Sequence, residues 1–282
     1  MSYLNTLYVK PNWLSLMKPR AFFYKDFLMQ SSYKFAFVTQ IAGIIFSASV
    51  WFFLSELFGQ AVSPYLEQFG GDYFSFVLIG VAFSSYMSVS LSSFSDNIRS
   101  AQTLGTLEAM LVTQTRIPVI LISSSIYSFV LTSFRVVIFL LFGALFLNLN
   151  IESANYVAAL LVLGITIICF GTIGIFSASF IIVLKKGDPF RWIFINLSML
   201  LGGVYYPTSV LPEWLKAISA FLPITYSLKG MRLALIQGLD TISIISHMAP
   251  LIIGTIILFP LSIMGFQAAV NWAKMEGSLM KY

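Results

Sequence analysis

Side chains able to do chemistry are few and widely separated in this chain. Its single histidine, His247, stands without an H-E-x-x-H or G-x-S-x-G pattern, which zinc and serine hydrolases of those types require. Its single cysteine, Cys169, lies inside an apolar run, so one chain forms no disulfide and no cysteine-based metal cluster. We expect His247 to be structural and Cys169 to be a small packing residue, and we predict neither catalytic nor metal-binding residues.

A site for ATP hydrolysis is also missing from the sequence. No G-x-x-x-x-G-K-[ST] loop occurs, and the dipeptide Gly-Lys is absent. Such a loop holds the phosphates of ATP with backbone amides and a lysine. We therefore expect no cofactor in this chain, and any work driven by ATP would come from a partner protein.

Arg135 is the ionisable residue that lies well inside an apolar run. A charge at the centre of a bilayer costs a few kcal/mol unless it faces water, protein or a headgroup. Arg135 is therefore a candidate contact for an anionic substrate, or else it reaches the outer interface or pairs with an outer carboxylate. Tyr205 and Tyr206, just before Pro207, either line the outer mouth of a substrate pathway or join the aromatic belt, which we favour.

The elements that position these residues must lie in a bilayer. The chain is 58% hydrophobic and 10% charged, with a mean hydropathy of +0.89, which does not fit a water-soluble surface. A spanning helix needs about 20 mostly apolar residues. The sequence predicts an all-α integral membrane protein with six such spans, at residues 35–58, 73–94, 118–147, 154–184, 190–206 and 248–270.

The positions of Lys and Arg predict the orientation, because cations in short flanking loops tend to stay in the cytoplasm. With the N-terminus inside, the outer segments hold only Lys216, Lys229 and Arg232. The inner segments then hold Lys10, Lys18, Arg20, Lys25, Lys34, Arg99, Arg116, Lys185, Lys186, Arg191, Lys274 and Lys281. We expect both termini in the cytoplasm, and the net charge of +5 reflects these loops and not a nucleic-acid surface.

Two segments beside the spans have the composition of membrane interfaces. The N-terminal residues 1–34 mix basic and bulky apolar side chains, which is typical of a helix in the headgroup layer, with a disordered tail as the alternative. Residues 207–237 are too apolar for an ordinary loop but are interrupted by Pro207, Pro212 and Pro223, so we expect short helices that dip into the membrane edge and not a seventh span. Arg232 is expected at the interface.

The inner loop between the second and third spans has an apolar stripe. Leu104, Leu107, Met110 and Leu111 recur at helical spacing, so one face of a short helix can press into a groove on another protein, or lie on the membrane surface. Glu108 lies among them and can pair with a basic residue at the rim of such a groove.

Two sequence motifs carry a family resemblance. The run GTLEAMLVTQTRIPVIL, residues 105–121, resembles the G-T-L-E-x-L-L-x-T-P segment before the third span of ABC-2-type permeases, although Gln114 stands where proline is common. The run GGVYYPTSVLPEWLKAISAFLPITYSLKGMR, residues 202–232, is similar to the second signature of that family. The ending WAKMEGSLMKY resembles the usual ending of the family.

The resemblance implies a domain organisation. A cytoplasmic N-terminal segment at 1–34 precedes a six-helix membrane domain at 35–270, and a cytoplasmic tail follows at 271–282. Re-entrant helices at about 211–237 would cap the outer end of the pathway. A coupling helix at about 99–113 would contact the ATPase through Leu104, Gly105, Thr106, Leu107, Glu108, Met110 and Leu111.

The same resemblance implies the function of a permease subunit that is not itself an enzyme. It would belong to an ATP-driven exporter of the bacterial cytoplasmic membrane, with two cytoplasmic subunits that bind ATP and Mg²⁺ and a second permease, either an identical copy or a relative. The cargo would be amphipathic or lipid-linked, such as a drug, a glycolipid or a polysaccharide precursor. Membrane lipid is an expected partner, and nucleic acid is not.

Two other classes of function compete with this interpretation. A carrier or channel that works without ATP would place polar groups at the midplane, where this chain offers little beyond Arg135. A membrane-embedded enzyme would use Asp188, Glu213 or His247. Those three residues lie on opposite predicted sides of the membrane, so they cannot converge on one reaction centre.

Overall fold

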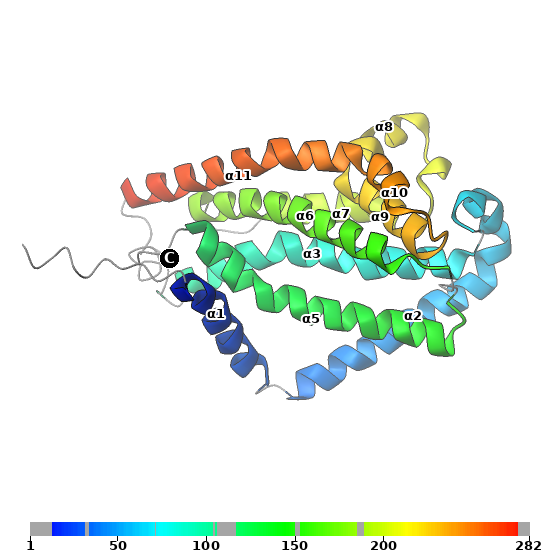
Figure 1. Ribbon diagram of the computed structural model, residues 1–282, viewed down its shortest axis with the longest axis horizontal. Helices are drawn as coiled ribbons and strands as arrows, with labels where there is room; N and C mark the ends of the chain where they lie inside the picture. Colours follow the sequence, from blue (N-terminus) through cyan, green and yellow to red (C-terminus); the bar gives the residue numbers. More distant parts are fainter. Residues whose placement is uncertain are drawn as a thin grey trace, which may run out of the picture.

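The structure is a computed structural model that describes residues 13–31, 34–70, 72–103, 105, 117–149, 153–184 and 189–275. Every regular element in these ranges is helical, which confirms the all-α fold class (Figure 1). The elements are α1 (Trp13–Ser31), α2 (Lys34–Val62), the 3-10 helix η1 (Ser63–Phe69), α3 (Tyr73–Thr103), α5 (Ile117–Phe146), α6 (Tyr156–Leu184), α7 (Pro189–Leu201), the 3-10 helix η2 (Thr208–Val210), α8 (Glu213–Phe221), α9 (Pro223–Leu235), α10 (Thr241–His247) and α11 (Ala249–Met275).

Five helices in the described ranges are long and apolar enough to cross a membrane, namely α2, α3, α5, α6 and α11. They correspond to five of the six predicted spans. The remaining one, at 190–206, is the short helix α7 of 13 residues. At about 1.5 Å per residue, α7 is about 20 Å long, less than the roughly 30 Å of a hydrocarbon core. The count of six full spans is therefore not confirmed.

Helix α7 nevertheless runs along α3 as a partial pass. At its start, Arg191 Nη1 lies 2.7 Å from Asp96 Oδ1 of α3. After its end, the carbonyl of Val204 reaches Gly80, sixteen residues earlier on α3 than Asp96. The short helices α8 to α10 then gather at this end of the bundle, while α1 and the end of α11 lie at the other (Figure 1).

Two glycines end α7 at Leu201. A Cβ on Gly202 would lie 2.1 Å from Ile224 Cγ2 of α9, so the chain approaches α9 too closely for any side chain. Gly203 has a φ of +80°, a left-handed conformation that other residues rarely adopt. The hydroxyl of Tyr206 donates to the carbonyl of Leu200 and closes the turn. The chain thus leaves the helix before it has crossed a bilayer.

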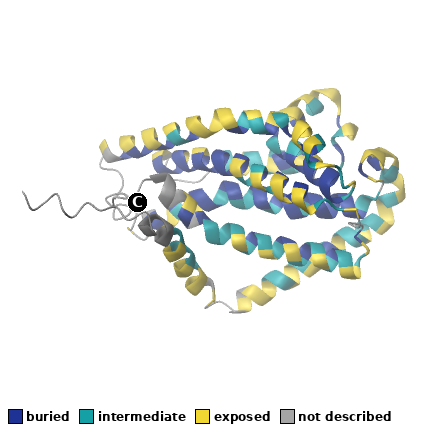
Figure 2. Ribbon diagram, in the orientation of Figure 1, coloured by how far each residue is buried: buried dark blue, intermediate teal, exposed yellow. Residues whose placement is uncertain are grey.

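The core is centred on α3, α6 and α9, and buried positions concentrate there (Figure 2). In α3, 78% of the most apolar stretch is buried, against only 6% in α2. A Cβ on Gly174 of α6 would lie 2.2 Å from the carbonyl oxygen of Ser90, so α3 and α6 touch backbone to backbone.

Polar side chains cap the N-termini of helices that follow the predicted outer loops. Asp72 caps α3, since its Oδ2 accepts from the amide of Ser75 at 2.9 Å. Asp240 caps α10, since it accepts from the Ser243 hydroxyl at 2.6 Å and the Ser243 amide at 3.2 Å. These hydrogen bonds favour the carboxylate and lower the pKa of Asp240. Orphan amides at helix starts are satisfied in this way.

The loop before α6 holds the end of α9. Asn155 Nδ2 donates to the carbonyl of Leu239 at 3.0 Å, and Ser153 Oγ donates to the carbonyl of Ile236 at 2.8 Å. Only glycine fits at position 238, because φ is +63° and an added Cβ would lie 2.0 Å from the Ser153 carbonyl oxygen. The predicted re-entrant segment is thereby tied to the membrane-spanning helices.

Two expectations about flanking segments have different outcomes. The predicted N-terminal helix is present as α1, where Phe23 contacts Tyr127 of α5 with ring centroids 5.5 Å apart; its placement in the headgroup layer stays a prediction. The expected interfacial position of Arg232 is wrong. Arg232 is only 3% exposed.

Candidate functional site

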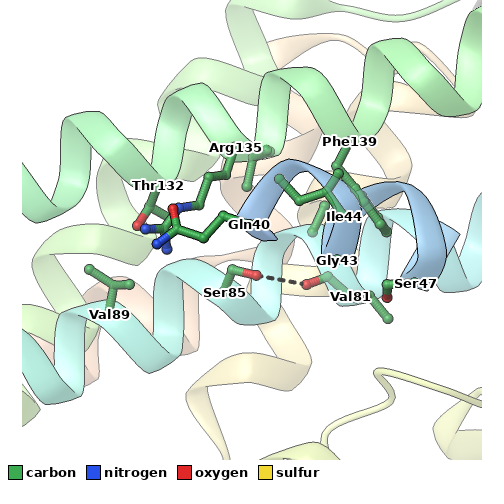
Figure 3. A pocket seen from close by; sticks show the side chains of 12 residues that line it. Gln40, Gly43, Ile44, Ser47, Val81, Ser85, Val89, Thr132, Arg135 and Phe139 are labelled. Atoms are coloured by element: carbon green, nitrogen blue, oxygen red, sulfur yellow. Dashed lines mark hydrogen bonds between the residues drawn. The ribbon is translucent and has the colours of Figure 1, made fainter. Parts of the chain in front are cut away.

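A pocket of about 290 Å³ lies between α2, α3 and α5 (Figure 3). It is lined by Gln40, Gly43, Ile44 and Ser47 of α2, by Val81, Ala82, Ser85 and Val89 of α3, and by Thr132, Arg135, Val136 and Phe139 of α5. Arg135 stands near the middle of α5, about 5 Å beyond its midpoint at about 1.5 Å per residue. The pocket therefore lies deep within the predicted membrane region.

Helix α2 supplies both a wall and an opening. Phe37 of α2 stacks on Phe134 of α5 with ring centroids 6.2 Å apart, which joins the two helices next to the pocket residue Arg135. Six residues further along α2, Gly43 is exposed, and a Cβ built on it meets nothing within 4 Å. The missing side chain of Gly43 leaves the pocket accessible from the α2 side.

The guanidinium of Arg135 is directed toward Gln40 and Thr132 inside the pocket (Figure 3). Its Nε is buried and has no hydrogen-bond partner among the described residues. The hydroxyl of Thr132 donates instead to the carbonyl of Ser128 of its own helix, at 2.8 Å. The donor capacity of Arg135 thus remains available to a bound group.

Among the described residues, no carboxylate lines the pocket. Within the described ranges, the cations in ion pairs with acidic side chains are Lys25, Arg191 and Lys216, and Arg135 is not among them. The alternative in which Arg135 pairs with an outer carboxylate therefore finds no support among these residues. Contact with an anionic substrate stays a prediction.

The tyrosines of the predicted pathway lie elsewhere. The ring of Tyr205 stacks on Trp51 of α2, with centroids 5.1 Å apart and planes 18° apart. Tyr206 closes the turn after α7, as described above, and neither tyrosine belongs to the lining of the pocket. The structure thus does not bring Arg135, Tyr205 and Tyr206 together in one site.

Sequence reasoning missed the structural role of Arg232. Its Nε and Nη2 donate to the carbonyl of Phe76 at 3.2 and 3.0 Å, and Nη2 also donates to the carbonyl of Val204 at 3.2 Å. Its guanidinium carbon lies 3.3 Å from the centroid of the Phe76 ring, which adds a cation–π contact. Arg232 therefore joins α9 to the first turns of α3 and to the turn after α7.

Gly80 makes this junction sterically feasible. A Cβ on Gly80 would lie 2.3 Å from the carbonyl oxygen of Val204 and 2.7 Å from Arg232 Nη2. A small cavity of about 110 Å³ adjoins the junction and includes Lys229 and Thr225 in its lining. The only signal in the sequence was Arg232 at the end of the second motif, and nothing in the local pattern related it to Gly80.

The predicted coupling residues Leu104, Thr106, Leu107, Glu108, Met110 and Leu111 lie outside the described residues. Gly105 is described, is exposed and has a φ of +65°, as expected for a residue just beyond a helix end. Helix α3 extends to Thr103, so residues 99–103 continue α3. The same helix that lines the pocket thus leads directly into the predicted coupling segment.

The residues considered for enzymatic chemistry do not form a site in the described ranges. His247 is exposed at the end of α10, and Cys169 is buried in the core. Glu213 pairs with Lys216 at 2.7 Å on the surface of α8. Asp188 lies outside the described residues, and those described include no group of three His, Cys, Asp or Glu side chains able to hold a metal ion.

The fold and the pocket define a multi-pass helical membrane protein with a largely apolar pocket, polar on one side, inside its bundle. The chain belongs to the ABC-2 type transporter family, whose family model matches residues 28–236, from α1 to just beyond α9. It is thus the permease of an ABC transporter, a transmembrane subunit that works with an ATP-binding subunit. No curated protein matches the chain.

Proposed function

We propose that this permease exports an amphipathic or lipid-linked molecule across the bacterial cytoplasmic membrane, driven by two ATP-binding subunits that bind ATP and Mg²⁺. The observation that carries the proposal is the continuity of α3. One unbroken helix of 31 residues lines the pocket with Val81 to Val89 and ends at Thr103, next to the predicted coupling segment. At about 1.5 Å per residue, this helix is about 45 Å long.

The contacts of α3 suggest how motion reaches the pocket. Its outer part is held by Arg232 at the carbonyl of Phe76 and by the close approach of Val204 to Gly80. Its other end packs through Phe94, Ile98 and Ala101 against α6 and α11. It also meets α7 through the partly exposed Asp96 to Arg191 ion pair, which is worth about 1 kcal/mol or less. When the ATP-binding subunits approach each other, α3 would tilt together with α6 and α11, against which it is packed.

Such a tilt would change the shape of the pocket, because α2, which forms one of its three walls, is loosely packed. Helix α2 buries only 6% of its most apolar stretch, so it can move relative to α3 with little loss of packing. The pocket would then have two states with different affinity for cargo, which coupled transport requires. The bare surface of α2, with Phe46, Phe53 and Leu57 exposed, also offers an apolar face for lipid or a second permease.

The pocket walls support an amphipathic cargo. Ile44, Val81, Val136 and Phe139 provide apolar surface, whereas Gln40 and Arg135 provide polar contacts on one side. A site of this mixed character accommodates an apolar group beside a polar or charged group. It offers no chain of ionisable groups for ion-coupled transport among its lining residues.

The test is purification of the chain from a detergent extract of cells that co-express a candidate ATP-binding subunit. We expect the subunit to be retained with the wild-type chain and lost with Glu108→Arg or Leu107→Asp. The first substitution reverses a charge in the predicted contact, and the second places a charge on its apolar face. Glu213→Arg is the matched control, because it makes the same charge reversal on exposed α8 at the other end of the bundle. It should leave retention unchanged.

Activity is then measured after reconstitution into vesicles. ATP hydrolysis should appear with the complex and disappear with Glu108→Arg, while Glu213→Arg hydrolyses ATP like the wild type. A chain that is isolated alone and transports cargo without ATP would instead be a carrier or channel. Equal loss of retention in both Glu-to-Arg variants would refute the assignment of the coupling segment.

A further inference from the structure

Arg135 forms no ion pair with an acidic side chain among the described residues. An arginine is protonated at all physiological pH values, and at the centre of a bilayer a cation is costly and usually marks a functional site. Arg135 lines its pocket without a carboxylate among the other lining residues. A bound anion would offset this charge.

The donors in the pocket have the geometry for an oxyanion. A guanidinium presents its N–H groups in a planar fork, which matches phosphate and carboxylate oxygens in pairs. The buried Nε of Arg135 has no partner among the described residues. Gln40, from the facing helix α2, lies beside the guanidinium and adds an amide donor (Figure 3).

The size and walls of the pocket indicate that only a headgroup enters. A volume of about 290 Å³ is at the lower end of small-molecule sites, too small for a complete lipid. The opening lies beside Gly43, whose missing side chain leaves free space. Outside it, Phe46, Phe134 and Val137 are 72%, 48% and 52% exposed, and they form an apolar surface suited to an acyl chain.

We propose that the pocket between α2, α3 and α5 binds the phosphate-type headgroup of an anionic amphiphile, with Arg135 as its cationic ligand and Gly43 as its point of entry. The acyl tail stays outside, against the apolar surface of α2 and α5. The inference rests on the proposed function only in identifying this amphiphile as the cargo. Binding itself does not require ATP.

The experiment measures equilibrium binding to the full chain in a neutral detergent. The probe is a fluorescent single-chain phosphatidic acid, compared with a neutral monoacylglycerol of the same tail and with inorganic phosphate as competitor. We expect saturable binding of the phosphatidic acid and at least tenfold weaker binding of the neutral lipid. Inorganic phosphate should compete at least 100-fold less effectively than unlabelled phosphatidic acid, because it lacks the tail.

Separate variants test the charge of Arg135 and the open space beside Gly43. Arg135→Gln should weaken phosphatidic acid binding at least tenfold, since one lost charge-assisted contact is worth about one such factor. Arg135→Lys should recover part of the affinity, because it restores the charge without the fork. Lys216→Gln is the control, as it removes the same charge from the surface of α8 and should bind like the wild type.

Gly43→Leu fills the opening and should also weaken binding at least tenfold. Its matched control is Gly164→Leu in α6, another exposed glycine around which an added Cβ meets nothing within 4 Å. Both variants add the same group in open space, so only the position differs. This pair also tests the site should Arg135→Gln fail to fold.

Several results would overturn the inference. Equal binding by Arg135→Gln and Lys216→Gln would remove Arg135 from the site, and equal binding by Gly43→Leu and Gly164→Leu would remove the pocket. Competition by inorganic phosphate as strong as by the lipid would make this a site for a free anion. If binding passes these tests but the complex shows no ATP-dependent transport, the proposed function fails while the binding site stands.

Discussion

The most direct test of the architecture is the substitution Gly80→Ala. The added methyl group would lie 2.3 Å from the carbonyl oxygen of Val204 and 2.7 Å from Arg232 Nη2, whereas ordinary contacts are 3.4–4 Å. The carbonyl must therefore move by about 1 Å or more. It cannot do so freely, because Gly203 holds the turn at a φ of +80° and Arg232 bonds the same oxygen.

The change in the free energy of unfolding caused by Gly80→Ala has three contributions. Overpacking costs about 1–3 kcal/mol. Disruption of the bond from Arg232 to the Val204 carbonyl costs about 1.5–3 kcal/mol, because the donor is charged and the site is buried. The higher helix propensity of alanine returns about 0.5–1 kcal/mol. The net loss in the free energy of unfolding is about 1.5–5.5 kcal/mol, which lowers the unfolding midpoint by roughly 3–20 °C.

The assay is thermal unfolding of the detergent-solubilised chain, followed by tryptophan fluorescence. Trp51 stacks on Tyr205 of the same turn and reports on it directly. The control is Gly164→Ala, where the added group meets nothing within 4 Å, so the midpoint should stay unchanged or rise slightly. A Gly80→Ala chain that unfolds within one degree of the Gly164→Ala chain would refute the close packing of α3 against this turn.

Two further predictions follow from the same structure. Arg232→Met removes the donor to the buried Val204 carbonyl and should lower the unfolding midpoint. Arg232→Lys should not restore the midpoint, because lysine lacks the planar fork of N–H groups that reaches two carbonyls. Equal midpoints for Arg232→Met and the wild type would contradict this role. The orientation of the chain in the membrane is measured by placing one reporter cysteine at a time, since the native Cys169 is buried and should not react. A membrane-impermeant maleimide should label Lys216→Cys on intact cells and Thr103→Cys only after permeabilisation. The reverse pattern would invert the predicted topology.

Where prediction and structure agree, the deciding interactions are local. The third predicted span, at 118–147, differs by one residue at each end from α5, Ile117–Phe146. Such a helix satisfies its own backbone hydrogen bonds, and its length follows from the number of consecutive apolar residues. The proline interruptions likewise predicted short helices, and α9 begins at Pro223 itself.

Where they disagree, contacts between distant residues decide. The predicted span at 190–206 counted apolar residues through Gly202, but the approach of Ile224 and the conformation of Gly203 end the helix earlier. Arg232 has the local pattern of an interfacial cation. It is buried because the carbonyl of Phe76, 156 residues earlier, accepts its hydrogen bonds.

The sequence by itself determined that the chain is helical, that it lies in a membrane and, through two motifs, which family it resembles. These properties depend on composition and on patterns within about 30 residues. Only the tertiary structure decided that Arg135 and Gln40 share one pocket, that Tyr205 and Tyr206 lie apart from it, and that Arg232 joins α3 to α9. Such juxtapositions arise from the packing of helices, because which carbonyl a buried guanidinium meets depends on residues far along the chain.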